Sequence, residues 1–263
     1  MSEIQIKNAF RNKNGKAMIA FITGGDPDLA TTEKLLLSMQ EAGADLIEIG
    51  IPFSDPIAEG PVIQEANERA LAAGCTIDRL FDSIKNARAG GVSVPMVFLT
   101  YVNPIVQYGA ERFMTRCNEC GMQGLIVPDL PFEEKGEIAD VCRKHGVDII
   151  SMIAPTSEDR IRKIAGEATG FLYVVSSLGV TGVRTSITTD IDAMIRLVRE
   201  ASDIPAAVGF GIATPEQARD MAKRSDGAIV GSAIVKLVAK HGRECIGPVS
   251  DYVKSLAEAV HGI

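Results

Sequence analysis

Residues 46–61, L-I-E-I-G-I-P-F-S-D-P-I-A-E-G-P, contain a buried strand and the loop that follows it. Glu48 lies between Ile47 and Ile49, in an apolar segment short enough to be a core strand. An ionised carboxylate is costly to remove from water, so an acid kept in such a strand is paired, protonated or used in chemistry. We interpret Glu48 as a functional residue, and the turn-rich loop after it brings a second carboxylate, Glu59.

The same order of apolar strand, turn and helix recurs along the chain. The apolar runs predict eight strands, at residues 17–23, 45–50, 95–99, 124–127, 147–151, 171–175, 205–209 and 227–230. Their continuous hydrophobicity is typical of parallel strands that are buried on both faces. Eight consecutive strand–helix units favour an α/β fold of the (β/α)8 type, the TIM barrel. An open doubly wound sheet is the competing fold, and it is disfavoured because no G-x-G-x-x-G follows the first strand.

Two helices are expected in addition to the eight of the minimal repeat. Residues 3–14 have a modest helical pattern and predict a leading helix that covers one end of the barrel. A helix that begins near Pro61 is separated by Gly74 from the next helix, so the second strand is followed by two helices. A chain of 263 residues suits a single barrel, and we expect residues 1–263 to form one domain.

The composition excludes several classes of protein. The chain has 27 basic and 34 acidic residues, a net charge of −7 and no Lys/Arg cluster, so we expect no nucleic-acid partner. No apolar run approaches the roughly 18 to 20 residues that span a bilayer, and the start lacks a signal-peptide core. Five cysteines, an odd number, do not suggest a disulfide framework. We therefore expect a cytoplasmic protein without a membrane partner.

Cys117 and Cys120 form a C-x-x-C, so a metal or redox site has to be considered. They lie in an apparent helix, with no second pair at zinc-site spacing and no His close in sequence. A free cysteine behaves as a small buried apolar residue, and we interpret both as helix packing. We expect no metal site.

Glycine-rich segments follow the last three strands, at the barrel end where functional groups gather. Gly231 and Ser232 open a helix whose free N–H groups and dipole favour an anion. Residues 209–211, G-F-G, and residues 179–182, G-V-T-G, follow the two preceding strands. Such glycines can simply make tight turns, but their arrival on three consecutive units favours a phosphate site.

Apolar side chains at the other strand ends can line a flat cavity beside that phosphate site. They are Phe21, Leu99, Tyr101, Tyr173 and Phe210, and strand-end packing is the alternative role, for Tyr101 as readily as substrate contact. Such a cavity suits a phosphorylated substrate with an apolar or aromatic head. Paired carboxylates suit proton transfer in aldol cleavage, isomerisation or elimination. No lysine stands at a strand end, which disfavours an imine-forming aldolase.

Six motifs, in order and over nearly the full length, resemble those of the tryptophan synthase α-subunit family. They are F-I-T-G-G-D-P, residues 46–61, V-P-D-L-P-F-E-E, G-V-T-G, G-F-G-I and G-S-A-I-V-K. The resemblance implies a lyase that cleaves indole-3-glycerol phosphate to indole and glyceraldehyde 3-phosphate by a retro-aldol step. It implies no cofactor in this chain. It also implies an α2β2 heterotetramer in which indole passes to a β subunit that uses pyridoxal phosphate.

The resemblance also assigns roles to particular residues. Glu48 matches the principal acid and base, which protonates the substituted ring carbon and helps to remove the proton of the adjacent hydroxyl. The matching substrate-binding residues are Phe21, Leu99, Tyr173, Thr181 and Phe210, and the matching phosphate-binding residues are Gly182, Gly211, Gly231 and Ser232. The loops after the second and sixth strands are expected to form a lid. Those after the second and third, including Pro56 and Asn103, are expected to face the β subunit.

The chain departs from the family pattern at Glu59. The usual motif ends S-D-P-L-A-D-G-P, with an aspartate that holds the indole N–H as positive charge develops on the ring. The extra methylene of Glu59 moves the carboxylate by about 1 to 1.5 Å, and a misplacement of that size can cost on the order of 10²-fold in rate. One alternative is therefore an allosteric and channelling subunit with weak lyase activity. A more distant one is another phosphate-binding barrel of aromatic amino-acid synthesis.

Overall fold

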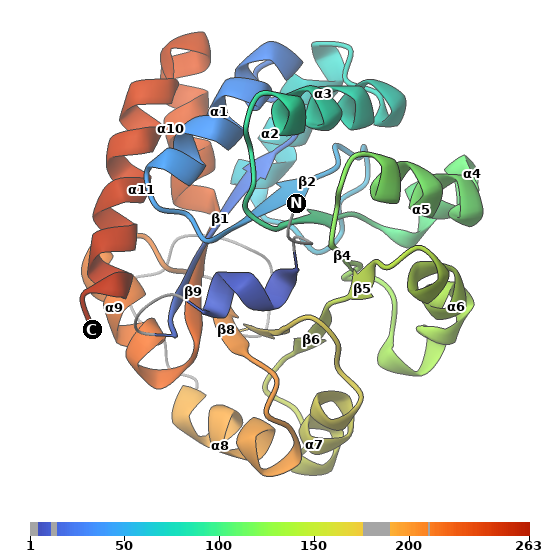
Figure 1. Cartoon of the computed structure of the whole chain (residues 1–263), viewed down its shortest axis with the longest axis vertical. Coiled ribbons are helices and arrows are strands. Elements are labelled where there is room, and N and C mark those ends of the chain that lie inside the picture. The colour runs from blue at the N-terminus through green and yellow to red at the C-terminus, as the bar shows by residue number, and fades with distance from the viewer. Residues whose placement is uncertain (1–4, 12–14, 176–189, 210) are drawn as a thin grey trace.

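The computed structural model describes residues 5–11, 15–175, 190–209 and 211–263. A ring of parallel strands forms the centre, and helices surround it (Figure 1). The strands are β1 Ala17–Thr23, β2 Leu46–Gly50, β3 Met96–Leu99, β4 Gly124–Ile126, β5 Asp148–Ile149, β6 Ser151–Ile153, β7 Leu172–Val175, β8 Ala206–Gly209 and β9 Gly227–Val230. Their order in the sheet is β5-β4-β3-β2-β1-β9-β8-β7-β6. The predicted TIM barrel is confirmed.

The fifth predicted strand, 147–151, is split in two. Its first part, β5, pairs with β4, whereas its second part, β6, extends to Ile153 and pairs with β7. Ile150 lies between the two parts, and its N–H donates to the carbonyl of Leu125 at 2.9 Å. The two ends of the sheet are thus consecutive in the chain, and the sheet curls into a nearly closed barrel.

Helices α1 to α11 and three short 3-10 helices connect the strands in the described parts of the chain. The α-helices are α1 Leu29–Glu41, α2 Pro61–Ala72, α3 Ile77–Ala89, α4 Val102–Tyr108, α5 Ala110–Glu119, α6 Gly136–Lys144, α7 Glu158–Gly166, α8 Ile191–Ala201, α9 Pro215–Arg224, α10 Ser232–His241 and α11 Ile246–His261. The 3-10 helices are η1 Ile6–Phe10, η2 Phe132–Glu134 and η3 Gly242–Glu244. Each described helix is too short or too polar to cross a membrane.

The predicted extra helices have mixed outcomes. The second strand is followed by two helices, α2 and α3, as predicted. The leading element is a single 3-10 helix, η1, shorter than the helix predicted over residues 3–14, of which 3–4 and 12–14 lie outside the described residues. Two further pairs were not predicted: α4 and α5 after β3, and α10 and α11 after β9.

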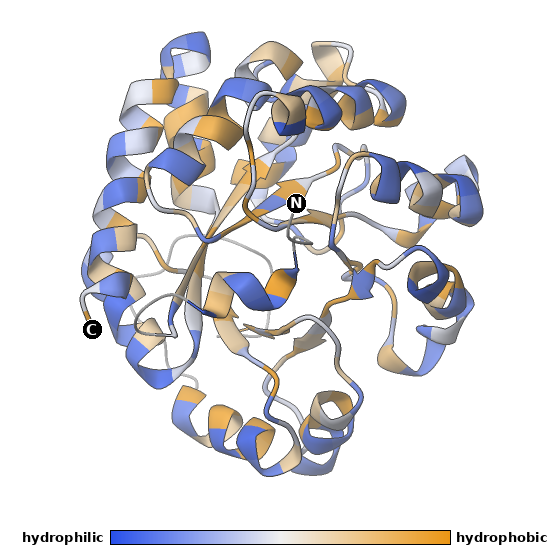
Figure 2. Cartoon of the chain, in the orientation of Figure 1, coloured by the Kyte–Doolittle hydropathy of each residue, from blue (hydrophilic) through white to orange (hydrophobic). Residues whose placement is uncertain are grey.

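Side chains alternate between two apolar layers along each strand. In β1, Met18 and Ala20 pack outward against the helices, while Ala17 and Ile19 belong to the cluster inside the barrel. Figure 2 shows the matching pattern, with apolar strands at the centre and polar outer faces on the helices. Element η1 adds Ile6 to the inner cluster and covers the barrel end where the strands begin. The opposite end, where the strands finish, is left for a site.

Candidate active site

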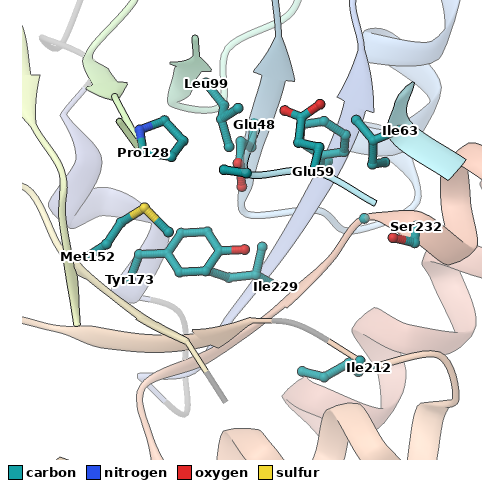
Figure 3. Close-up of a pocket in the computed structure, with 14 residues that line it drawn as sticks. Glu48, Glu59, Ile63, Leu99, Pro128, Met152, Tyr173, Ile212, Ile229 and Ser232 are labelled. Atoms are coloured by element: carbon teal, nitrogen blue, oxygen red, sulfur yellow. The ribbon is translucent and has the colours of Figure 1, made fainter. Parts of the chain in front are cut away.

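One pocket lies at the C-terminal ends of the strands and brings together side chains that are far apart in sequence (Figure 3). Its space is about 660 Å³ when the part open to solvent is included. Its described lining is Phe21, Glu48, Ala58, Glu59, Ile63, Leu99, Pro128, Met152, Tyr173, Gly211, Ile212, Ile229, Gly231 and Ser232. Thr181, Gly182 and Phe210, which the sequence also assigns to the site, lie outside the described residues.

Glu48 points into this pocket from the middle of β2. The alternation of the strand turns Ile47 and Ile49 outward to the helices, so Glu48 faces inward, in register with Phe21 of β1 and Val97 of β3. The side chain is 1% exposed, and its Oε2 has no hydrogen-bond partner among the described residues. Burial, and secondarily the charge of Glu59, raises the pKa of Glu48 to about 8. Glu48 therefore holds a proton at neutral pH.

Glu59 enters the pocket from the loop after β2 and is held by two neighbours. The side-chain amide of Asn67, on α2, donates to its Oε2 at 3.0 Å, and the hydroxyl of Tyr101 also bonds to the carboxyl group. Glu59 is 5% exposed, and burial raises its pKa to about 7, while both hydrogen bonds oppose that rise. Of the two acids, Glu59 ionises first.

The loop that carries Glu59 is tied to the barrel through its backbone. The Ala58 N–H donates to the Tyr101 hydroxyl at 3.1 Å, and the Gln64 side chain donates to the Glu59 carbonyl at 2.8 Å. The sequence did not predict a role for Asn67, and it left two possible roles for Tyr101, strand-end packing and substrate contact. One signal was available, because Asn67 is a polar residue on the face of α2 that buries Ile63 and Ala66.

Glycines let the aromatic rings lie flat against the barrel wall. A Cβ on Gly209 would stand 2.6 Å from ring carbons of Tyr173, and one on Gly50 would stand 2.9 Å from the Phe21 ring. These distances are shorter than any stable contact, so only glycine leaves room for the rings. Phe21, Leu99 and Tyr173 all line the pocket, and their contact with substrate stays a prediction.

The far end of the pocket is built from backbone. Gly231 precedes α10, and Ser232 is its first residue, so the first N–H groups of that helix face the region lined by Gly231 and Ser232. Gly211, with a φ of +79°, adds a turn that other residues rarely adopt. No basic side chain is found in the described lining. Backbone donors at a helix N-terminus can hold an anion without one.

The cysteine pair is part of the helix packing. Cys117 and Cys120 are buried in the layer between α5 and the sheet, as expected, and burial raises the pKa of both thiols. Within the described residues, no group of three or more His, Cys, Asp or Glu side chains could hold a metal ion.

Comparisons of the sequence and of the structure with known proteins identify the same family. The tryptophan synthase alpha chain family matches residues 8–260. The alpha chain from Shouchella clausii is 46% identical over 253 residues, 93% of this chain and 94% of the relative, and that from Lacticaseibacillus casei is 46% identical over 248 residues, 94% and 93% respectively. Among solved structures, the tryptophan synthase alpha chain from Legionella pneumophila superposes with a TM-score of 0.86 at 34% identity, covering 98% of this chain and 97% of the other. A chain of Mycobacterium tuberculosis tryptophan synthase superposes with a TM-score of 0.88 at 29% identity and covers 99% of both chains. These matches in sequence and structure show that the chain belongs to the tryptophan synthase alpha chain family.

Proposed function

We propose that this chain cleaves indole-3-glycerol phosphate to indole and glyceraldehyde 3-phosphate, with Glu48 as the acid and base of the reaction. The observation that carries the proposal is the state of Glu48. It is buried in the pocket, its Oε2 has no hydrogen-bond partner among the described residues, and its pKa is about 8. A carboxyl group with a pKa near the working pH can both donate and accept a proton.

The shape of the pocket supports one orientation of the substrate. The phosphate would lie at Gly211, Gly231 and Ser232, where backbone N–H groups and the α10 dipole favour an anion. The indole ring would lie between Phe21, Leu99 and Tyr173. Thr181, Gly182 and Phe210 are proposed to complete the wall and the phosphate site.

The two carboxyl groups can then carry out the proton transfers of the cleavage. Protonated Glu48 gives its proton to the ring carbon that bears the glycerol phosphate chain, and positive charge moves to the ring nitrogen. The Glu59 carboxylate accepts a hydrogen bond from that N–H and stabilises the charge. Ionised Glu48 then takes the proton of the adjacent hydroxyl, the carbon–carbon bond breaks, and its electrons restore the aromatic ring. The products are indole and an aldehyde, and Glu48 is protonated again.

A β subunit is the proposed partner, in an α2β2 heterotetramer, and pyridoxal phosphate is expected there and not in this chain. Two large apolar side chains are exposed in the segments after β2 and β3 that the resemblance assigns to that contact. Ile57 beside Pro56 is 75% exposed, and Val106 on the helix of Asn103 is 58% exposed. We propose that both side chains contact the β subunit. We propose that indole leaves the pocket toward this face.

A cytoplasmic location is also proposed. All five cysteines are free and buried, and thiols in this state suit a reducing compartment.

Because Glu59 replaces the usual aspartate, the alternative function is that of a chiefly allosteric and channelling subunit with weak lyase activity of its own. The more distant alternative, another barrel of aromatic amino-acid synthesis, is excluded by the family match. An assay of indole release from indole-3-glycerol phosphate, with and without a β subunit, separates the readings. Turnover by the chain alone that the β subunit increases supports the lyase. Full dependence on the β subunit supports the alternative, and no indole under either condition contradicts the proposal.

A further inference from the structure

Asp129 follows β4, does not line the pocket, and bonds to the start of a neighbouring helix. Both of its carboxylate oxygens accept from the N–H of Val102, at 3.0 and 3.2 Å. Val102 is the first residue of α4, and Tyr101, at the N-cap position, makes no capping bond with its own side chain. Asp129 therefore caps α4 from the loop after β4, where its negative charge also suits the helix dipole.

The residue that this cap fixes is Tyr101, whose side chain reaches a third loop. Tyr101 is almost fully buried, and its ring centroid lies 5.4 Å from that of Phe53, in the loop after β2. Its hydroxyl accepts from the Ala58 N–H at 3.1 Å and bonds to the Glu59 carboxyl group. A continuous path of contacts thus runs from Asp129 through the Tyr101–Val102 backbone to Glu59.

We propose that Asp129 is a positioning residue for Glu59: by capping α4 it sets the backbone of Tyr101, and the Tyr101 hydroxyl then holds the Glu59 carboxyl group in the pocket. This inference rests on the proposed function of Glu59. It adds a residue outside the pocket that acts on the reaction through another side chain.

Electrostatics support the same path. Burial, and then the nearby charges of Glu59 and Asp129, raises the pKa of Tyr101, so the phenol stays protonated. A protonated phenol can donate to Glu59 while it accepts from Ala58. The protonated phenol is the form that both hydrogen bonds require, and the charge of Asp129 is consistent with it.

A double-mutant cycle tests the path directly. Asp129→Ala removes the cap, Asp129→Asn keeps an oxygen for the Val102 N–H, and Tyr101→Phe keeps the ring but removes the hydroxyl. Since Asp129 acts by placing Glu59, we expect Asp129→Ala to lower kcat/KM by roughly 10- to 100-fold, and Asp129→Asn by less than about 3-fold. In the Tyr101→Phe background, Asp129→Ala should lower it by less than about 3-fold more. Equal losses in both backgrounds would overturn the proposal.

Thr76→Ala is the matched control. The Thr76 hydroxyl accepts from the Arg79 N–H and caps α3, so the variant also loses a helix-capping hydrogen bond, in this case one without a link to Glu59. We expect it to have lower thermal stability and unchanged kcat/KM.

Asp129→Ala and Tyr101→Phe should both move the acid limb of the pH–rate profile to higher pH, because a hydrogen bond that lowers the Glu59 pKa is lost. An unmoved limb in Asp129→Ala contradicts the positioning role. Absence of lyase activity in wild type and Thr76→Ala alike would instead contradict the proposed function.

Discussion

Asn67 donates a hydrogen bond of 3.0 Å from its side-chain amide to the Glu59 carboxyl group, and both side chains are buried. The bond joins α2 to the loop that follows β2, so the helix after the loop holds the loop's own acid in place. Because a donor stabilises the ionised form, Asn67 limits the rise in the Glu59 pKa that burial causes.

Replacing Asn67 by Leu should therefore move the acid limb of the pH–rate profile. Loss of the donor raises the Glu59 pKa above its value of about 7, so ionised Glu59 is present only at higher pH. A loss of roughly one hydrogen bond to a charged group, about 1.5 to 3 kcal/mol, corresponds to a shift of about one to two pH units. The profile of kcat/KM against pH measures it. Gln64→Ala is the control, because Gln64 bonds to the Glu59 carbonyl and should leave the limb in place.

Glu48 should make the protein less stable as the pH rises. Its folded-state pKa of about 8 exceeds the ordinary glutamate value of 4.5, so the folded protein binds more protons than the unfolded chain between these values. The stability that protonation provides is complete below about pH 4.5 and is lost as the pH rises through 8. The glutamine of Glu48→Gln cannot ionise. The free energy of unfolding of this variant, relative to wild type, should therefore increase by roughly 3 to 5 kcal/mol as the pH rises from 4.5 to 8.5. Urea unfolding of both proteins at the two pH values measures the gain, and a pH-independent difference would argue against a buried neutral Glu48.

Substitutions of Glu59 test whether the longer side chain is used. In the folded protein its carboxyl group reaches both Asn67 and Tyr101, so the surroundings fit a glutamate. We expect Glu59→Ala to lower kcat by on the order of 10²-fold and Glu59→Asp to retain more activity than Ala but less than wild type. Kinetics of indole release measure the order. An aspartate variant that exceeds wild type would favour the alternative of a weak lyase, and an alanine variant equal to wild type would remove Glu59 from catalysis.

Gly209→Ala should damage the apolar wall. The added methyl group would stand 2.6 Å from Tyr173 ring carbons, so the ring must move into the pocket. We expect KM for indole-3-glycerol phosphate to rise by about 10-fold or more, since the indole would lose its place beside the ring. Gly136→Ala is a suitable control, because a Cβ there meets nothing within 4 Å. A KM in Gly209→Ala as low as in this control would contradict the assignment of Tyr173 to the wall.

The sequence predicted the parts of the fold that depend on local pattern. Seven of the eight strands follow from apolar runs, and Gly74 separates α2 from α3 as expected. The break at Ile150 was not predictable, because the apolar run continues through it and only the change of pairing partner from β4 to β7 divides the strand. Helix α4 was missed because Asn103 was assigned to the loop after the third strand, although Gly109, at a φ of +87°, marks the turn between α4 and α5.

The same division applies to the site. Glu48 was found because a lone acid in an apolar strand is unusual, and Gly231 and Ser232 because they open a helix after a strand. The contacts of Asn67 and Tyr101 with Glu59 depend on how α2 and the loops after β2 and β3 pack together, and the sequence pattern does not give those distances. The roles of Thr181, Gly182 and Phe210 stay predictions.

The measurement that tests the central claim most directly is indole release by Glu48→Gln. Glutamine keeps the size of Glu48 but can neither give nor take the proton, so turnover of indole-3-glycerol phosphate should fall by at least 10³-fold. The fold should be retained, as measured by circular dichroism, and so should affinity for inorganic phosphate, which is proposed to bind at Gly231 and Ser232. Loss of indole release with fold and phosphate binding intact is the predicted result. Turnover close to that of wild type would contradict the assignment of Glu48 as the acid and base.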